Sequence, residues 1–194
     1  MNFLAHIYLS GDNIQLAFGN LIADGVKGKA FLDYPKSIQK GIILHREIDN
    51  YTDHHPLFKA CVSKLFPTYH HYSRVIIDMY FDHFLAANWE KYHRHNLESF
   101  SLNFFNKLQK SIHLFPEHIQ RFCNALIKYN WFQQYTTIAD LKVILYQMEQ
   151  RTAFTSNLAA STVELSQNYD YFEKQFSEFI KEIKIFTQSK INTQ

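Results

Sequence analysis

The sequence predicts an all-α fold, with a single compact multi-helix domain spanning residues 1–194. Three observations favour this class. Apolar residues recur at helical spacing in several segments, whereas strict alternation of apolar and polar residues is hard to find. All five glycines lie within the first 41 residues, so the rest of the chain has few signals for tight turns. Hydrophobic residues make up 46% of the 194 residues, which is enough to bury a sizeable core.

Two polar residues near the N-terminus are unexpected where they stand. His6 lies in the otherwise apolar run "NFLAHIYLS", where a lone histidine is more often a hydrogen-bonded core residue. Asp24 ends "NLIAD" and precedes "GVKGK", at the expected end of a helix, where a negative charge opposes the helix dipole. A ligand or ion-pair role is therefore favoured for Asp24.

The segment 41–56, "GIILHREIDNYTDHHP", is the most unusual of the chain. On a helical wheel Asp49 lies about 40° from His45, and this polar stripe borders the apolar stripe instead of opposing it. Neutral imidazole and ionised carboxylate at this spacing are suitable metal ligands. The alternative is an ordinary surface pair that stabilises the helix by about 0.2–0.5 kcal/mol.

The segment 73–89, "SRVIIDMYFDHFLAANW", places two carboxylates on the apolar side of a helix. A buried carboxylate without a partner is costly, so each needs a cation, a metal or a proton. Arg74 is predicted to pair with Asp78, which leaves Asp82 in need of another partner. His83 is expected to point away from Asp82. We therefore expect Arg74, Asp78 and His83 to support a site without performing its chemistry.

The remaining helices are predicted over 117–132, 137–154 and 171–186. The last of these has a single apolar stripe, typical of a helix with one core-facing side: Phe172, Phe176, Phe179, Ile180 and Ile183. The four prolines, at positions 35, 56, 67 and 116, are expected between helices because proline lacks the N–H that a helix interior needs. Element counting gives roughly seven to nine helices.

Composition excludes several classes of function. No run of about eighteen apolar residues is present, so no membrane span is expected. The start "MNFLAHIYLSGDN" does not have the pattern of a signal peptide. The net charge of +2 does not indicate a nucleic-acid partner. Cys61 and Cys123 are expected to be reduced thiols of a cytoplasmic protein.

Four stretches, in order, resemble the acyl carrier protein phosphodiesterase family: "MNFLAHIYLS", "GNLIADGVKG", "GIILHREIDNYTDHHP" and "IIDMYFDHFLAANW". Beyond them the resemblance is confined to helical character and to "QMEQR" at 147–151. Gly25 departs from the family pattern, which usually has an aromatic residue after "IAD". This departure is expected to loosen one wall of the pocket.

The resemblance implies an all-helical fold like that of the HD-type phosphohydrolases. It also implies hydrolysis of the phosphodiester that joins 4′-phosphopantetheine to a serine of acyl carrier protein, with Mn²⁺, or Mg²⁺, as the cofactor. The metal ligands implied are His6, Asp24, His45, Asp49 and Asp82. A divalent ion suits this reaction because it neutralises phosphate charge and lowers the pKa of a bound water toward about 7.

The remaining roles are assigned by the chemistry of the reaction. Proton transfer is expected from carboxylate or imidazole groups, namely Asp24, Asp53 and His55. Arg46, as a planar fork, and Lys27, as a point charge, are expected to hold the phosphate. A basic rim for the acidic carrier protein is expected from the lysines near these motifs, which are Lys27, Lys29, Lys36 and Lys40.

Two alternatives fit the same residues. A nucleotide phosphohydrolase of the HD type would use nearly the same ligands but release phosphate or a nucleoside. A non-catalytic helical binding module would bury the polar residues as a hydrogen-bonded network and would need no metal. The oligomeric state is not predicted.

Overall fold

The structure, a computed structural model, describes residues 1–152 and 156–193. Eleven α-helices and several short 3₁₀ turns make up these ranges, which contain no β-strand, so the predicted all-α class is confirmed. The helices are α1 (Phe3–Leu9), α2 (Ile14–Ile22), α3 (Lys36–His54), α4 (Pro56–Tyr69), α5 (Ser73–Ala87), α6 (Leu97–Ser111), α7 (Glu117–Lys128), α8 (Trp131–Gln134), α9 (Ile138–Glu149), α10 (Thr162–Gln167) and α11 (Tyr169–Thr193).

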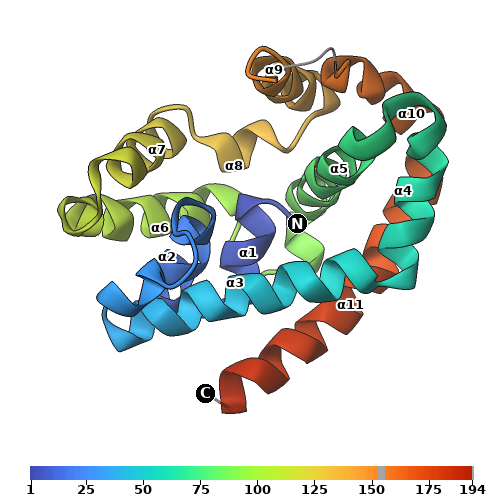
Figure 1. Ribbon diagram of the computed structural model, residues 1–194. Helices are drawn as coiled ribbons and strands as arrows, with labels where there is room; N and C mark the ends of the chain where they lie inside the picture. The colour runs from blue at the N-terminus through green and yellow to red at the C-terminus, as the bar shows by residue number, and fades with distance from the viewer. Residues whose placement is uncertain (153–155, 194) are drawn as a thin grey trace.

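The short helix α1 lies at the centre of the molecule (Figure 1). It packs against α2, α5 and α11. Helices α7, α8 and α9 follow one another on the side of the molecule away from α3 (Figure 1). Every residue of α1 after Phe3 is buried. His6 is therefore a core residue because its helix is surrounded, as the apolar run around it suggested.

Helices α2 and α3 cross in backbone contact at two glycines. A Cβ atom added to Gly19 would overlap the carbonyl oxygen of Ile38, and one added to Gly41 would overlap that of Leu16. Only glycine lacks this atom, so any other residue at either position would force the two helices apart. The crossing brings the residue after Gly19, which is Asn20, next to the turn of α3 that follows Gly41.

Several local predictions can be compared with the observed helices. The stripe on 171–186 is confirmed, because all five of its residues are buried in α11. The helix expected over 117–132 is broken at Asn130, whose φ of 45° is left-handed, so that α7 and α8 are separate. Pro67 was expected between helices, and this was wrong. It lies inside the last turn of α4, where the proline removes one backbone N–H donor and the helix ends two residues later at Tyr69.

The helix expected over 137–154 ends at Glu149, and residues 153 and 154 lie outside the described ranges. The number of helices exceeds the expected seven to nine, because helices as short as α8 and α10 span too few residues to show a helical pattern in the sequence. Buried apolar residues form one core across the helices.

Within the described ranges, no helix combines the length and the apolar character that crossing a membrane requires. Cys61 and Cys123 are free and buried, and burial raises the pKa of each thiol to about 12. Both thiols are therefore protonated and unreactive near neutral pH.

Candidate metal centre

Two histidines and one aspartate converge beside α1. The Nε2 atom of His6 lies 3.1 Å from Asp49 Oδ1, and the Nε2 atom of His45 lies 3.0 Å from Asp49 Oδ2. Within the described ranges, these three residues form the one group of His, Cys, Asp and Glu side chains whose ligand atoms all lie within 4.8 Å of one another. The predicted i, i+4 pairing of His45 and Asp49 on one helix face is confirmed.

Asn20 orients both imidazole rings. The rings of His6 and His45 stack with centroids 4.0 Å apart, and both turn their Nδ1 atoms toward Asn20. His45 Nδ1 lies 2.9 Å from the Asn20 backbone oxygen, which can only accept, so this nitrogen carries a hydrogen. The Asn20 amide donates through Nδ2 to the His6 carbonyl, which leaves Oδ1 to accept from His6 Nδ1 at 2.8 Å.

This orientation leaves lone pairs where the three groups meet. With Nδ1 protonated on each neutral ring, both Nε2 atoms present lone pairs to oxygen atoms that are also acceptors. His6 Nε2 faces Asp49 Oδ1 and the Met1 carbonyl oxygen, each at 3.1 Å. Acceptors at this separation repel unless a cation lies between them. The arrangement therefore requires a proton or a metal ion.

A proton satisfies only one of the two rings. Burial lowers the pKa of His45, but the hydrogen bonds to Asp24 and Asp49 outweigh it and raise the pKa to about 9. Burial, followed by repulsion from His45, lowers the pKa of His6 to about 4. Burial opposes ionisation of Asp49, yet its interactions with His45 and His6 hold its pKa below the ordinary value. Near neutral pH, His6 and the Asp49 carboxylate thus face each other without a proton between them.

Asp24 reaches the same cluster from the solvent side. It lies in the 3₁₀ turn that follows α2, and its Oδ1 atom is 3.1 Å from His45 Nε2. The hydrogen bond from His45 is the main cause that lowers the pKa of Asp24. Its side chain remains 69% exposed, unlike the buried histidines. The predicted ion-pair role of Asp24 is confirmed, and its ligand role stays a prediction.

Asp82 has a different set of partners from the one predicted. Its side chain is fully buried, and its two oxygens accept the backbone N–H groups of Asn2, Leu4 and Ala5 at 2.8–3.3 Å. Burial raises the pKa of Asp82 to about 7, against the opposing effect of these donors. The carboxylate caps the N-terminus of α1, so the structure does not bring it into the His6, His45 and Asp49 group.

The partner predicted for Asp78 was wrong. Arg74 Nη1 lies 2.5 Å from Asp53, whereas Asp78 Oδ1 lies 2.8 Å from the Met1 amino nitrogen. Arg74 lies one turn before Asp78 on α5, which is why the two were expected to pair. Asp53, at the end of α3, lies closer to the guanidinium and pairs with it instead. Asp53 is thus held in an exposed ion pair, and the structure does not bring it to the cluster.

The other two histidines near the motifs have structural contacts. His55 lies at the corner between α3 and α4, where its Nδ1 atom accepts from Leu57 N and its Nε2 atom lies 3.2 Å from Glu182. His83 Nδ1 donates to the Tyr135 carbonyl oxygen, 2.8 Å away. Neither contacts the cluster, as expected for His83. A proton-transfer role for His55 has no contact to support it.

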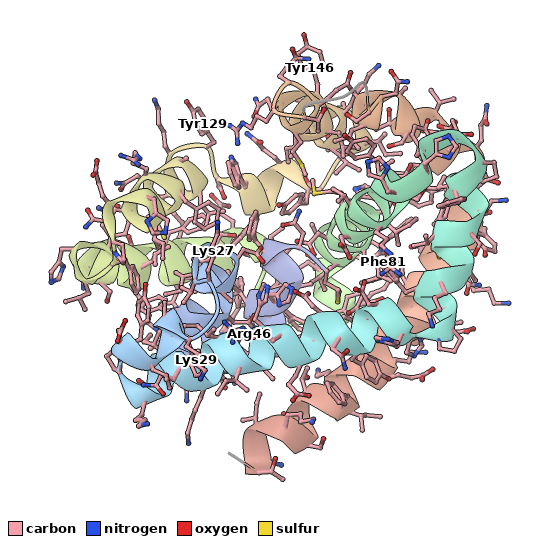
Figure 2. All side chains as sticks on the ribbon, viewed as in Figure 1. Lys27, Lys29, Arg46, Phe81, Tyr129 and Tyr146 are labelled. Atoms are coloured by element: carbon pink, nitrogen blue, oxygen red, sulfur yellow. The ribbon has the colours of Figure 1, made fainter. Side chains whose placement is uncertain are left out.

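The basic residues lie on the α2–α3 side of the molecule. Figure 2 shows Lys27, Lys29 and Arg46 there, whereas the exposed Tyr129 and Tyr146 lie on the α7–α9 side. The predicted rim residues Lys27, Lys29, Lys36 and Lys40 are all exposed. Arg46 holds the loop that follows Asp24, donating to the carbonyl oxygens at positions 26 and 28, and its guanidinium lies over a ring of that loop. Phosphate binding by these residues stays a prediction.

A cavity of about 360 Å³ adjoins the cluster. Asp24 and Met1, whose oxygens contact the two histidines, form part of its wall, and residues from α5, α7, α8 and α9 form the rest. A second cavity of about 250 Å³ lies on the other side of Asp24, beside Gly25. A Cβ atom at Gly25 would lie 3.2 Å from Ile119, so α7 closely approaches the position where the family usually has an aromatic residue.

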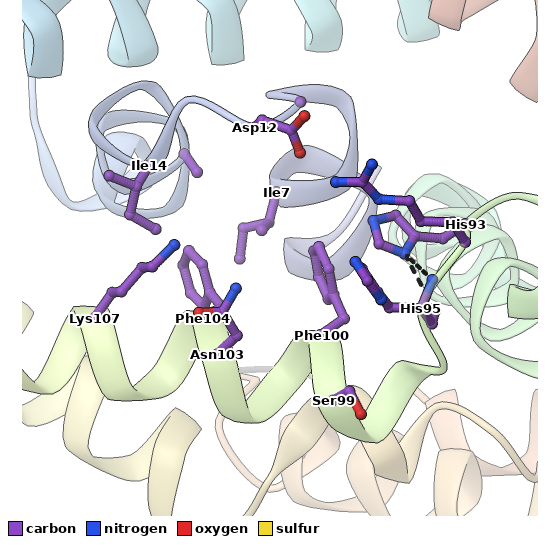
Figure 3. Close-up of a pocket in the computed structure, with 13 residues that line it drawn as sticks. Ile7, Asp12, Ile14, His93, His95, Ser99, Phe100, Asn103, Phe104 and Lys107 are labelled. Carbon is purple, nitrogen blue, oxygen red and sulfur yellow. Dashed lines mark hydrogen bonds between the residues drawn. The ribbon is translucent and has the colours of Figure 1, made fainter.

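A separate hollow between the α1–α2 loop and α6 has a different character (Figure 3). Its volume is about 130 Å³, and its polar groups include His93, His95, Arg94 and Lys107. His93 Nδ1 accepts from the His95 backbone N–H at 3.1 Å, so that ring is used to fix a turn. None of the residues that line this hollow belongs to the metal-ligand group.

Sequence reasoning missed Asn20 and the residues of the larger cavity. Asn20 is fully buried within the apolar helix "IQLAFGNLI", and that isolated polar residue was the available signal. The cavity walls from α7 to α9 carry ordinary helical patterns. The segment "QMEQR" was the one pointer to them, since Gln147, Met148 and Arg151 all line the cavity.

Fold and site together define an all-helical protein in which two buried histidines and a partly exposed aspartate converge beside a cavity. The chain belongs to the family described as acyl carrier protein phosphodiesterase, whose sequence profile matches residues 1–183. Its relatives include proteins named acyl carrier protein phosphodiesterase from Photorhabdus laumondii, 31% identical over 92% of this chain and 91% of that protein, and from Yersinia enterocolitica, 29% identical over 98% and 99%. No solved structure matches the chain. The HD-like arrangement therefore stays a prediction.

Proposed function

We propose that this protein is a metal-dependent phosphodiesterase that hydrolyses the bond between 4′-phosphopantetheine and a serine of acyl carrier protein. Family membership supports the substrate, since the relatives are named for this activity. The observation that carries metal dependence is the convergence of His6, His45 and Asp49, whose imidazole nitrogen and carboxylate oxygen atoms lie 3.0–3.1 Å apart. Imidazole nitrogen and carboxylate oxygen suit Mn²⁺, with Mg²⁺ as the second candidate.

His6, His45 and Asp49 would hold the ion. Asn20 keeps both rings in the tautomer that presents Nε2, which is the usual task of a residue behind a metal ligand. A divalent ion bound there would neutralise phosphate charge and lower the pKa of a water molecule. The residues of the chain then need only to position the ester and move a proton.

Asp24 is the proposed proton carrier. Its exposed carboxylate adjoins the centre and has a lowered pKa, so it is ionised and able to accept a proton from the attacking water. The water oxygen bonds to phosphorus, and the bond from phosphorus to the serine oxygen breaks. The proton held by Asp24 passes to that oxygen, which gives apo carrier protein and 4′-phosphopantetheine.

Mass spectrometry of holo acyl carrier protein incubated with the enzyme and Mn²⁺ tests this proposal. We expect the carrier to lose the mass of one phosphopantetheinyl group, and EDTA to prevent the loss. Asp24→Asn should retain Mn²⁺ binding and lose turnover, whereas Asp53→Asn should keep both. An unchanged carrier mass would contradict the proposal. Release of phosphate or nucleoside from nucleotides would then favour the alternative enzyme, and folding without metal affinity a binding module.

A further inference from the structure

The larger cavity has a defined polarity. At one end, Asp24 and the Met1 carbonyl oxygen contact the histidines of the centre. At the other end lie Gln147 and Arg151, at the end of α9. A ligand whose phosphate lies at the centre would therefore extend from Asp24 toward α9.

Aromatic rings form one wall of this cavity. Phe3 of α1, Phe122 of α7 and Trp131 of α8 lie in mutual contact, with ring centroids 5.0–6.0 Å apart. Ile144 and Met148 on α9 add apolar surface to the same cavity. Its volume of about 360 Å³ is within the range of cavities that enclose small organic ligands, roughly 300–1,000 Å³.

The polar end of the cavity contains two side chains that can donate hydrogen bonds. Among the described residues, neither the Gln147 amide nor the Arg151 guanidinium has a side-chain hydrogen bond or ion-pair partner. Both are exposed at the rim of the cavity. Each can donate to a carbonyl oxygen, and Gln147 can also accept from an amide N–H.

We propose that this cavity holds the pantetheine arm of the substrate, with Gln147 and Arg151 binding its amide groups. The inference rests on the proposed function, because it assumes that the phosphate lies at the centre. The arm has two methyl groups on the carbon next to its phosphate-bearing CH₂, followed by a hydroxyl and two amides. The cavity offers a partner for each part of the arm, because its aromatic wall can pack against the methyl groups and its two donors can bind the amides. The carrier protein would then approach from the outer side, where the exposed lysines of the α2–α3 side lie.

Filling the cavity provides the first test. Ile144→Trp places a large side chain inside it, whereas Val143→Trp adds the same side chain at a position that is 50% exposed on the same helix. For Ile144→Trp we expect the inhibition constant of free 4′-phosphopantetheine and the KM for holo acyl carrier protein to rise about tenfold or more. Val143→Trp should match wild type. Both variants should keep wild-type Mn²⁺ affinity and hydrolysis of methyl 4-nitrophenyl phosphate, a diester without the arm.

Arg151→Ala tests the polar end without disturbing the core. Loss of one hydrogen bond should raise KM and the inhibition constant by about two- to tenfold and leave kcat nearly unchanged. Wild-type constants in both Ile144→Trp and Arg151→Ala would overturn the proposal. Tighter inhibition by a nucleotide than by 4′-phosphopantetheine, abolished in Ile144→Trp, would also overturn it and assign the cavity to a base.

The two proposals fail in distinguishable ways. If wild type does not convert holo carrier protein, the proposed function is wrong. Calorimetric titration of the Mn²⁺-loaded protein with 4′-phosphopantetheine still tests the cavity, because Ile144→Trp must weaken that binding. If wild type turns over the carrier and neither variant changes its constants, the reaction stands and the cavity assignment is wrong.

Discussion

Two pairs of histidines in this protein show what distinguishes a candidate metal centre from histidines on the surface. His6 and His45 come from different helices, stack at 4.0 Å and are buried. His93 and His95 lie two residues apart in one exposed turn, with ring centroids 5.6 Å apart (Figure 3). In the first pair both Nε2 atoms face carboxylate oxygen, whereas in the second a ring nitrogen accepts from the backbone.

The difference lies in what surrounds the rings. Asn20 fixes the tautomer of the buried pair, and Asp49, whose side chain is partly exposed, supplies a negative charge beside both rings. Within the described ranges, the ring hydrogen bonds of the exposed pair join the His93 ring to the His95 backbone, and no side chain does for them what Asn20 does for the buried pair. Two imidazoles therefore become a candidate ion site only when a third residue orients them and a carboxylate completes the set.

The largest effect is expected from removing one ring of the buried pair. His45→Ala takes away a ligand and leaves Asp24 and Asp49 without their shared partner. We expect calorimetry to detect no Mn²⁺ binding and mass spectrometry to detect no conversion of the carrier, with helicity by circular dichroism retained. His93→Ala and His95→Ala serve as controls and should behave as wild type. Equal losses of Mn²⁺ binding and of carrier conversion in all three variants would show that the buried and exposed pairs do not differ.

The next effect concerns the residue behind the rings. Asn20→Leu keeps the size of the side chain but removes the acceptor that fixes the His6 tautomer. We expect Mn²⁺ affinity to fall by about 10–100-fold, as for other residues that orient metal ligands. Asn103→Leu, a matched change in the hollow of Figure 3, should have no effect on affinity. Full affinity in Asn20→Leu would mean that packing alone orients the rings.

The dependence of stability on pH sharpens the comparison further. In protein stripped of metal by a chelator, the pKa of His45 is raised from 6.5 to about 9. Because the folded state holds this proton more tightly, its stabilisation is fully present below pH 6.5 and is lost as pH rises through about 9. We expect the free energy of unfolding to fall by roughly 3 kcal/mol across this window relative to His45→Gln. Urea denaturation at stepped pH measures it, and parallel curves for the two proteins would contradict it.

The smallest effect is expected from surface charge. Exposed lysines act mainly on the rate of association and are screened over about 8 Å at physiological salt. Reversing Lys36 and Lys40 together to Glu should raise KM for the carrier protein several-fold, weaken its dependence on salt and leave kcat nearly unchanged. The same reversal of Arg94 and Lys107, at the hollow, is the control and should leave KM unchanged. If the control pair raises KM instead, the carrier docks on that face.

Local sequence determined the fold class and half of the centre. Periodicity predicts the helices because an amphipathic stripe is a property of neighbouring residues, as in α11. The His45 and Asp49 pair was predictable for the same reason, since residues four apart share a helix face. His6 and Asp24 could be singled out by type, but nothing local shows that they meet His45 and Asp49.

Tertiary structure decided the partners of Asp82, Asp78 and Asp53. Asp82 caps α1 and Asp53 pairs with Arg74, because the packing of helices that are distant in sequence places these partners next to each other. The role of Asn20 depends on the contact of Gly19 with α3, and the cavity depends on how α8 packs on α1 and α9 packs on α5. A hydrogen bond or ion pair forms with whichever partner the packed chain places within about 3 Å. The sequence determined which groups needed a partner, and the packing of the helices decided which partner each one met.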